Sequence, residues 1–263
     1  MEKVLNIAHR GASAWAPENT MAAFWLAHEI GADGFELDVQ LTNDDQIVVI
    51  HDGSVNRTTN GTGRIADLAL SQVRGLDAGS WFNSTRPRRA KNQYIGERIP
   101  TLSEVLDLAQ KQKLILYIEL KFVRDSRPGI EERVVTLVDK YRLMDKVVIE
   151  SFSLESISRV KELDPRFRTA ALFGRSLTAP RRSIKKIIER AAESHADEIA
   201  LDKTLLTARV VNAANEAGLP IVAWTVNSRL YLKHCIKLGL KGIITNYPDR
   251  LATMISRDDD LQR

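Results

Sequence analysis

Cysteine is almost absent from the sequence, since Cys235 is the only one among 263 residues. A single cysteine excludes a disulfide within the chain, and the lack of any CxxC pair excludes a zinc knuckle. No apolar run approaches the roughly 18 residues that a membrane helix needs, and the first residues lack the apolar run of a signal peptide. We therefore expect a cytoplasmic protein with no integral membrane association.

A strong excess of either charge is also missing. Lysine and arginine number 38, aspartate and glutamate 34, and the formal net charge is +4. Because acids and bases are mixed along the chain, this balance favours a solvated surface and no nucleic-acid partner. With 44% hydrophobic residues, the chain has an ordinary globular composition, which excludes collagen, coiled coil and disorder. The composition leaves the oligomeric state unknown.

Short apolar runs alternate with amphipathic stretches along most of the chain. Most of these runs are rich in β-branched residues or leucine, and they span 4–8, 34–39, 47–50, 114–118, 147–149, 169–173, 198–201, 220–226 and 242–245. Such runs are typical of strands buried on both faces. Helical periodicity lies between several of them, as in 102–109, where Thr101 and Glu104 form a capping-box pattern. Alternating strands and helices predict a parallel sheet.

One junction between runs is too short for a helix. Asn43, Asp44 and Asp45 are turn formers between 34–39 and 47–50, and they predict a β-hairpin. Without the hairpin return, eight parallel strands remain. This pattern predicts an α/β protein with a closed (β/α)8 TIM barrel. An open doubly wound sheet is the alternative, although no GxGxxG motif follows a strand.

The stretch 53–100 interrupts the alternation of strands and helices. It carries turn-forming residues and a basic run, but Leu76, Trp81 and Phe82 favour an ordered segment. We therefore interpret 1–256 as a single domain, in which 53–100 is a small insertion over one mouth of the barrel. The range 257–263 is interpreted as a polar tail.

Polar side chains cluster at the carboxyl ends of four predicted elements. They are His9, Arg10, Glu36, Asp38, His51, Asp52, Glu119 and Lys121. In a TIM barrel these strand ends form the active-site face. Residues two apart on a strand point the same way, so Glu36 and Asp38 form a carboxylate pair. A turn centred between Asp44 and Asp45 places His51 directly across from Asp38.

These residue types indicate a particular chemistry. Three converging carboxylates without cysteine favour one hard divalent cation, Mg²⁺ or Ca²⁺. Two histidines can serve as an acid–base pair near neutral pH, and Arg10 and Lys121 suit a phosphate. The combination favours metal-assisted cleavage of a phosphate ester.

Each feature also has a purely structural interpretation. Glu36 and Asp38 are also compatible with acids of a structural ion pair at the bottom of the barrel, and Trp224 is compatible with a core position. Asn19 or Thr20 is compatible with the cap of a following helix. The joint occurrence of so many polar residues at strand ends nevertheless favours a functional site.

A set of short motifs follows one order along nearly the whole chain. The motifs are Ala8-His9-Arg10-Gly11, Pro17-Glu18-Asn19-Thr20, Glu36-Leu37-Asp38-Val39, His51-Asp52, Arg57-Thr58-Thr59, Asp77-Ala78-Gly79-Ser80-Trp81, Ile99-Pro100-Thr101-Leu102, Glu119-Leu120-Lys121, Ser151-Phe152, Trp224-Thr225-Val226-Asn227 and Thr245-Asn246-Tyr247-Pro248. This ordered set resembles the glycerophosphodiester phosphodiesterase family, a branch of the phosphatidylinositol-phospholipase-C-like barrels.

The resemblance implies a (β/α)8 barrel with a subdomain inserted after the second histidine motif. It further implies a divalent cation held by Glu36, Asp38 and Glu119, and a catalytic acid–base pair formed by His9 and His51. The implied reaction is the hydrolysis of glycerophosphodiesters to sn-glycerol 3-phosphate and an alcohol. Either water or the neighbouring glycerol hydroxyl can be the nucleophile.

The resemblance extends to substrate contacts. Arg10 and Lys121 match phosphate-contacting positions, and Trp224 matches an aromatic residue near the glycerol. One departure is Asn246, where members often carry aspartate. Supporting roles beside the site are expected for Glu18, Asn19 and Asp52.

Two other functions fit the same motifs. A lysophospholipase D would use this site on lipid-bearing diesters, and it would need an apolar rim near the mouth of the barrel. A barrel that only binds phosphoesters would have lost a metal carboxylate or a catalytic histidine, and all five are present.

Overall fold

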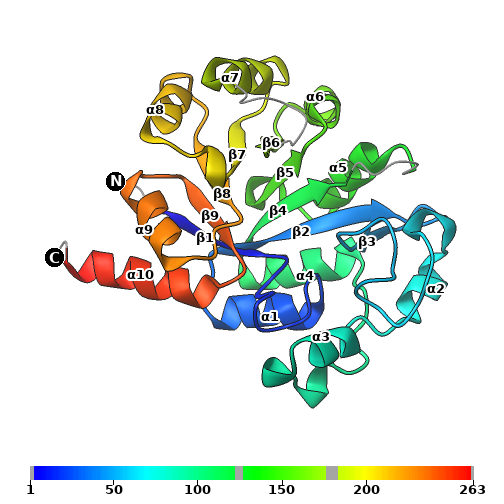
Figure 1. The fold of residues 1–263 in the computed structure, drawn as a ribbon. Helices are drawn as coiled ribbons and strands as arrows, with labels where there is room; N and C mark the ends of the chain where they lie inside the picture. Colours follow the sequence, from blue (N-terminus) through cyan, green and yellow to red (C-terminus); the bar gives the residue numbers. More distant parts are fainter. Residues whose placement is uncertain (1–2, 122–126, 176–182, 262–263) are drawn as a thin grey trace.

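The computed structural model describes residues 3–121, 127–175 and 183–261. Its nine-stranded sheet has the order β1-β9-β8-β7-β6-β5-β4-β2-β3, and β1 also pairs with β2. Helices surround the strands (Figure 1). Each strand overlaps one of the apolar runs of the sequence, because runs of β-branched residues and leucine suit strands that are covered on both faces.

The parallel strands are β1 (Leu5–His9), β2 (Gly34–Leu41), β4 (Ile115–Leu120), β5 (Val147–Ser151), β6 (Arg168–Phe173), β7 (Glu198–Asp202), β8 (Ile221–Trp224) and β9 (Gly242–Thr245). The helices are α1 (Met21–Glu29), α2 (Leu70–Arg74), α3 (Ser80–Thr85), α4 (Leu102–Gln112), α5 (Ile130–Lys140), α6 (Leu154–Leu163), α7 (Ile184–Glu193), α8 (Ala208–Glu216), α9 (Arg229–Lys237) and α10 (Pro248–Leu261). Short 3₁₀ helices are η1 (Ile65–Asp67), η2 (Pro87–Arg89), η3 (Asn92–Tyr94), η4 (Met144–Lys146) and η5 (Lys203–Leu205).

Closure of the sheet is the feature that decides the fold class. Strand β1 is paired in parallel with β9 on one side and with β2 on the other. The eight parallel strands therefore form a closed barrel, which confirms the predicted (β/α)8 architecture, and the open doubly wound alternative is wrong. Side chains such as Ile7, Tyr117 and Val148 form a cluster of their own that is fully buried, as the packed interior of such a barrel requires.

Side-chain caps define the starts of two helices near the site. The Thr101 hydroxyl accepts a hydrogen bond from the Glu104 N–H at 3.3 Å, and Glu104 accepts one from the Thr101 N–H at 2.8 Å. This confirms the predicted capping box. Thr20 caps α1 by accepting from the Ala23 N–H, so Thr20 takes the capping role for which the sequence also allowed Asn19.

The hairpin after β2 exists, but the predicted register is wrong by one residue. Strand β3 (Ile47–Val49) is antiparallel to β2 and pairs Val39 with Val49. The backbone carbonyl of Asp38 therefore accepts from the Ile50 N–H at 2.9 Å. The cause is a three-residue loop in which Asp45 adopts a left-handed φ of 60°, a common hairpin geometry. As a result, His51 lies beyond the strand and not directly across from Asp38.

The stretch 53–100 consists of short helices joined by turns. Its residues Val55, Ile65 and Val73 join Val48 and Ile50 in one buried apolar cluster. Further along, Phe82 and Tyr94 pack against residues that follow β1. The segment is thus packed against the barrel, beside β3 (Figure 1). Its treatment as an insertion within a 1–256 domain stays a prediction.

Helix α10 continues to Leu261, so most of the range interpreted as a polar tail has a helical backbone. Residues 262–263 lie outside the described part. Within the described ranges, no helix is both long and apolar enough to cross a membrane.

Candidate active site

A cavity of about 240 Å³ opens among residues at the carboxyl ends of the barrel strands. Its lining includes seven of the predicted site residues: His9, Arg10, Glu36, His51, Glu119, Lys121 and Trp224. Asp38 does not line the cavity but forms ion pairs with Arg10 and Lys121, which do. The structure therefore brings the predicted catalytic, metal and phosphate residues together in one place.

Three buried carboxylates form the base of this site. Each of Glu36, Asp38 and Glu119 offers an oxygen, and these three oxygens lie within 4.8 Å of one another. The arrangement follows from strand register, because Asp38 of β2 pairs with Glu119 of β4, and Glu36 lies two residues before Asp38 on the same strand. An all-oxygen set of this kind fits a hard divalent cation.

The electrostatics of these carboxylates support the same interpretation. Burial and the nearby charge of Asp38 raise the pKa of Glu36 well above its usual range and that of Glu119 to about 7. Burial also acts to raise the pKa of Asp38, but Lys121 and Arg10 outweigh it and hold that pKa below its usual range. Burial and mutual repulsion oppose ionisation of these acids, and a bound cation would stabilise their ionised forms.

Two cations border the carboxylates. Lys121 Nζ lies 2.9 Å from Asp38 Oδ1 and 2.8 Å from Glu119 Oε1. Arg10 Nε lies 3.2 Å from Asp38 Oδ2. Both cations are also among the residues that line the cavity, so their positive charge is available to an anionic ligand there.

The turn after β1 explains why histidine, arginine and glycine occur in succession. Arg10 has a left-handed φ of 56°, and its backbone N–H donates to Glu36 Oε2 at 3.0 Å. Gly11 has φ 76°, and a Cβ there would lie 2.6 Å from the carbonyl carbon of Ala23. Only glycine allows this approach of the turn to α1. The turn thus leaves His9 at the strand end, in register with Glu36.

His9 has a defined orientation. Its Nδ1 lies 2.6 Å from Oδ1 of Asn246, and because an amide oxygen only accepts, Nδ1 carries the proton. The free Nε2 lies 3.7 Å from Glu36 Oε2. Burial, followed by the charge of Arg10, lowers the pKa of His9 to about 3, so the imidazole is neutral at physiological pH.

His51, which follows β3, lines the same cavity. Its Nδ1 lies 2.6 Å from Asp52 Oδ1, and its Nε2 has no hydrogen-bond partner among the residues that the structure describes. Burial lowers the pKa of His51. A hydrogen bond from Arg57 is the largest influence on Asp52 and holds its pKa at about 2, so an ionised carboxylate supports His51.

A network of alternating charges connects the two histidine motifs. Glu18 Oε1 accepts from Arg10 at 2.8 Å and from Arg57 at 2.7 Å. Arg57 Nε in turn donates to Asp52 at 2.7 Å. Glu18 therefore links the arginine beside the carboxylates to the residue that supports His51.

Asn19 has a role that its place in the Pro-Glu-Asn-Thr motif only partly indicates. Its Nδ2 donates to Asp38 Oδ2 at 2.7 Å, and its backbone has a left-handed φ of 56°, which asparagine tolerates better than most residues. Asn19 therefore binds one oxygen of the Asp38 carboxylate, and Lys121 binds the other.

Glu150 and Phe152 also line the cavity, although Glu150 is not among the predicted site residues and Phe152 has no predicted role. Glu150 is only 1% exposed and pairs in register with Glu119, and its Oε2 has no hydrogen-bond partner in the described part of the chain. The sequence did contain a signal for Glu150, because this acid directly follows the apolar run 147–149, as Glu119 follows the run 114–118. Phe152 packs edge-on against Trp224, with ring centroids 5.5 Å apart.

Replacing Glu150 with glutamine is expected to stabilise the metal-free protein at alkaline pH. Burial and the charge of Glu119 raise the pKa of Glu150 well above its ordinary value of 4.5. The folded state thus binds this proton to higher pH than the unfolded state does, and the native carboxyl costs stability as the pH rises above 4.5. Each 1 kcal/mol recovered corresponds to about 2–4 °C in Tm for a chain of this size.

Thermal unfolding of Glu150→Gln in chelator at pH 5 and pH 8 measures this effect. The Tm difference from the native protein is expected to be small at pH 5 and larger at pH 8. Glu155→Gln, at an exposed position on α6, is the matched control and leaves Tm unchanged at both values. A loss of stability at pH 8 would contradict the expectation.

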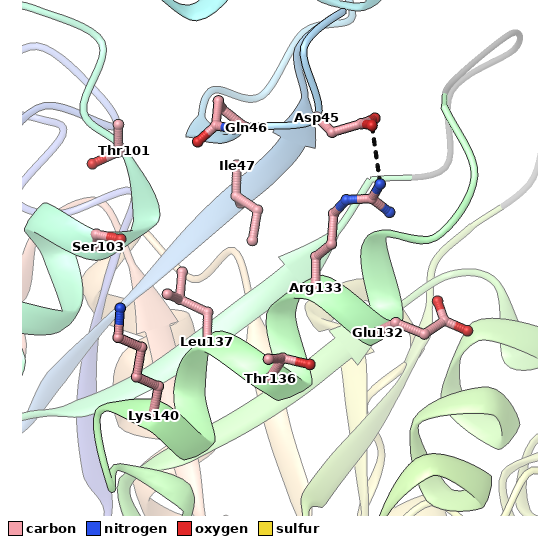
Figure 2. A pocket seen from close by; sticks show the side chains of 10 residues that line it. All are labelled: Asp45, Gln46, Ile47, Thr101, Ser103, Glu132, Arg133, Thr136, Leu137 and Lys140. Atoms are coloured by element: carbon pink, nitrogen blue, oxygen red, sulfur yellow. Dashed lines mark ion pairs between the residues drawn. The ribbon is translucent and has the colours of Figure 1, made fainter.

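A second cavity of about 400 Å³ lies between β3, α4 and α5. Figure 2 shows its side chains, including the ion pair of Asp45 with Arg133 at 3.1 Å. Its other acid, Glu132, is paired with Arg159. This larger cavity contains no histidine, so it lacks the acid–base and carboxylate combination of the strand-end site.

Comparison with known proteins agrees with this geometry. Residues 9–250 match the model of the glycerophosphoryl diester phosphodiesterase family. The chain is 37% identical to a glycerophosphodiester phosphodiesterase of Bacillus subtilis (strain 168), over 94% of this chain and 85% of that protein. It is also 37% identical to one from Caldanaerobacter subterraneus subsp. tengcongensis, over 97% of this chain and 99% of that protein.

Solved structures of phosphodiesterases are also similar to this chain. An Oleispira antarctica phosphodiesterase in complex with the product sn-glycerol-3-phosphate is 27% identical, with a TM-score of 0.79 and 97% of each chain covered. Glycerophosphodiester phosphodiesterase from Agrobacterium tumefaciens str. C58 is 29% identical, also with a TM-score of 0.79, and 96% of this chain and 100% of that chain are covered. The chain therefore belongs to the glycerophosphodiester phosphodiesterase family, and it is a phosphoric diester hydrolase.

Proposed function

We propose that the reaction is metal-dependent and uses His9 and His51 as its acid–base pair. The observation that carries this proposal is the convergence of three buried carboxylates, within 4.8 Å of one another, on a cavity lined by both histidines. Glu36, Asp38 and Glu119 would hold one divalent cation, Mg²⁺ or Ca²⁺. When bound, such a cation supplies Lewis-acid stabilisation of charge on the phosphoryl group.

The two histidines divide the proton transfers according to their partners. His9 is neutral and its Nε2 is unprotonated, so it is suited to accept the proton of the attacking hydroxyl, from water or from the neighbouring glycerol. Nδ1 of His51 faces the carboxylate of Asp52 at 2.6 Å, whereas that of His9 faces the neutral amide of Asn246. A carboxylate stabilises a protonated ring, so His51 is the better donor to the leaving alkoxide.

Arg10 and Lys121 neutralise charge that builds up on the phosphoryl oxygens. Both are held in place by Asp38, so little reorganisation is needed as the reaction proceeds. Trp224 and Phe152 form an aromatic corner that suits the carbon skeleton of the glycerol. These roles rest on position and charge.

The cavity favours water-soluble glycerophosphodiesters over the lipid-bearing diesters of a lysophospholipase D. Phe152, at 50% exposure, is the one large apolar residue among those lining the cavity that is also exposed in the described ranges. A single side chain is a small apolar rim for an acyl chain. We therefore expect glycerophosphocholine to be hydrolysed at least about tenfold more efficiently than lysophosphatidylcholine, a difference of about 1.4 kcal/mol in transition-state binding.

A coupled glycerol 3-phosphate assay tests this function. Diesters of choline, ethanolamine, glycerol and inositol are compared with Mg²⁺ and Ca²⁺ in turn, and choline release is measured for both choline substrates. Release of glycerol 3-phosphate from the water-soluble diesters is the expected result. Faster choline release from lysophosphatidylcholine would favour the lysophospholipase D alternative.

A further inference from the structure

A third cavity, of about 570 Å³, lies on the same face of the barrel as the active site. We call it the arginine pocket and define it by Arg86, Arg88, Arg89, Asn227, Asn246 and Tyr247. The arginines belong to the turn around η2, and the other three residues follow β8 and β9. Loops after barrel strands lie at their carboxyl ends, so this pocket adjoins the active-site cavity.

The arginine pocket is positively charged and lacks an internal counter-ion. Three of its nine lining residues are arginines and none is acidic. Within the described part of the chain, none of these three arginines forms an ion pair. Asp249, an acid on the adjoining helix α10, accepts a hydrogen bond from Trp15 at 3.0 Å.

Two of the guanidinium groups are already oriented. Arg86 Nη1 donates to the Ser13 carbonyl at 3.0 Å, and Arg89 donates to the Ala14 carbonyl. Arg89 also lies over the ring of Trp15, 4.4 Å from its centroid. Each guanidinium carries five N–H donors. The contacts with Ser13 and Ala14 therefore fix the two groups and leave further N–H donors for a ligand. Oriented arginine donors are suited to bidentate binding of phosphate.

One residue joins the arginine pocket to the catalytic site. Asn246 lines the pocket, and its Oδ1 accepts from Nδ1 of His9 at 2.6 Å. An anion in the arginine pocket would therefore lie one side chain away from the reacting phosphodiester. A single substrate with two phosphate groups would have to extend past the Asn246 side chain to occupy both places.

We propose that the arginine pocket binds a second phosphate of the substrate, so that the preferred glycerophosphodiesters are those whose alcohol is itself phosphorylated. This inference rests on the proposed function, and it names the substrate class of that same site. The second phosphate is bound and not cleaved. Its contribution is to affinity and to the position of the leaving alcohol.

Two substrates that differ only in the second phosphate test this proposal. Glycerophosphoinositol and glycerophosphoinositol 4-phosphate are compared by kcat/KM, with glycerol 3-phosphate as the common product. The native enzyme is expected to favour the phosphorylated substrate by roughly tenfold, as one or two charged hydrogen bonds supply. Arg88→Ala and Arg86→Ala are each expected to lower this preference about fivefold or more, and added salt to lower it further.

Controls separate this proposal from others. Arg166→Ala, at an exposed arginine before β6 that pairs with Asp164, leaves the preference unchanged. Equal kcat/KM for the two substrates, or a preference that survives in both pocket variants, overturns the proposal. Inorganic phosphate that stimulates hydrolysis of glycerophosphoinositol would assign the pocket to a free effector and would also overturn it. Failure to hydrolyse either substrate refutes the proposed function instead.

Discussion

Replacing His9 or His51 with alanine is expected to lower kcat by about 10²–10⁴-fold, the usual contribution of a positioned acid or base. Each variant removes an imidazole whose Nδ1 is held at 2.6 Å by its partner, Asn246 or Asp52. The fold is expected to remain, because the Arg57 bridge to Asp52 and Glu18 does not involve either ring. The coupled assay and thermal unfolding measure the two quantities on the same samples.

The leaving group distinguishes the acid from the base. A 4-nitrophenyl glycerophosphate diester releases an alcohol that needs little protonation, so His51→Ala is expected to recover much of its rate on this substrate. His9→Ala stays slow on both substrates because the attacking hydroxyl still lacks its base. His234→Ala, at an exposed position on α9, is the matched control with unchanged kcat. Near-normal turnover by either site variant would refute its assignment.

Removal of divalent cations is expected to reduce turnover to background, and Mg²⁺ or Ca²⁺ to restore it. The physical reason is the carboxylate cluster, whose crowded oxygens leave Glu36 and Glu119 with raised pKa values. Without a cation, these acids offer the phosphodiester no Lewis acid and a less favourable local charge. The measurement is kcat in chelator, then after titration with each metal.

A binding measurement separates loss of metal from loss of chemistry. Adding the cation to the metal-free protein raises its Tm, and the rise grows with the logarithm of the ratio of cation concentration to Kd. Asp38→Asn, which lowers the charge of the cluster at its most buried member, is expected to lose both this rise and the activity. Asp164→Asn, at the surface pair with Arg166, keeps both. Full turnover in excess chelator would exclude a role for the metal.

Strand register explains why so much of the site could be anticipated. Period-two alternation on β2 and β4 fixes which side chains share a face, and parallel pairing then sets Asp38 beside Glu119. Alternating strands and helices predicted the barrel, and closure follows from the pairing of β1 with β2. These features depend on local pattern and on chain order, which the sequence contains.

Features that depend on loop geometry were not predictable in the same way. The turn after β2 has three residues, and nothing in the run Asn43-Asp44-Asp45 distinguishes this length from two, so the position of His51 was misplaced. Arg57 lies in an irregular segment, and its contact with Glu18 depends on how that segment packs. Glu150 was overlooked, although its parity with Val148 on β5 makes it face the barrel interior.

The closed ring of strands determines which orders of the strands along the chain can form the same active site. Strand β1 is bonded to both β2 and β9, so the ring has no first or last member in space. The site residues on the strands, such as Glu36, Asp38 and Glu119, hold their places by pairing with neighbours around the ring, independent of their distance from either end of the chain. The same active centre is therefore compatible with circular permutation, in which translation starts at a different strand and the cyclic order is preserved.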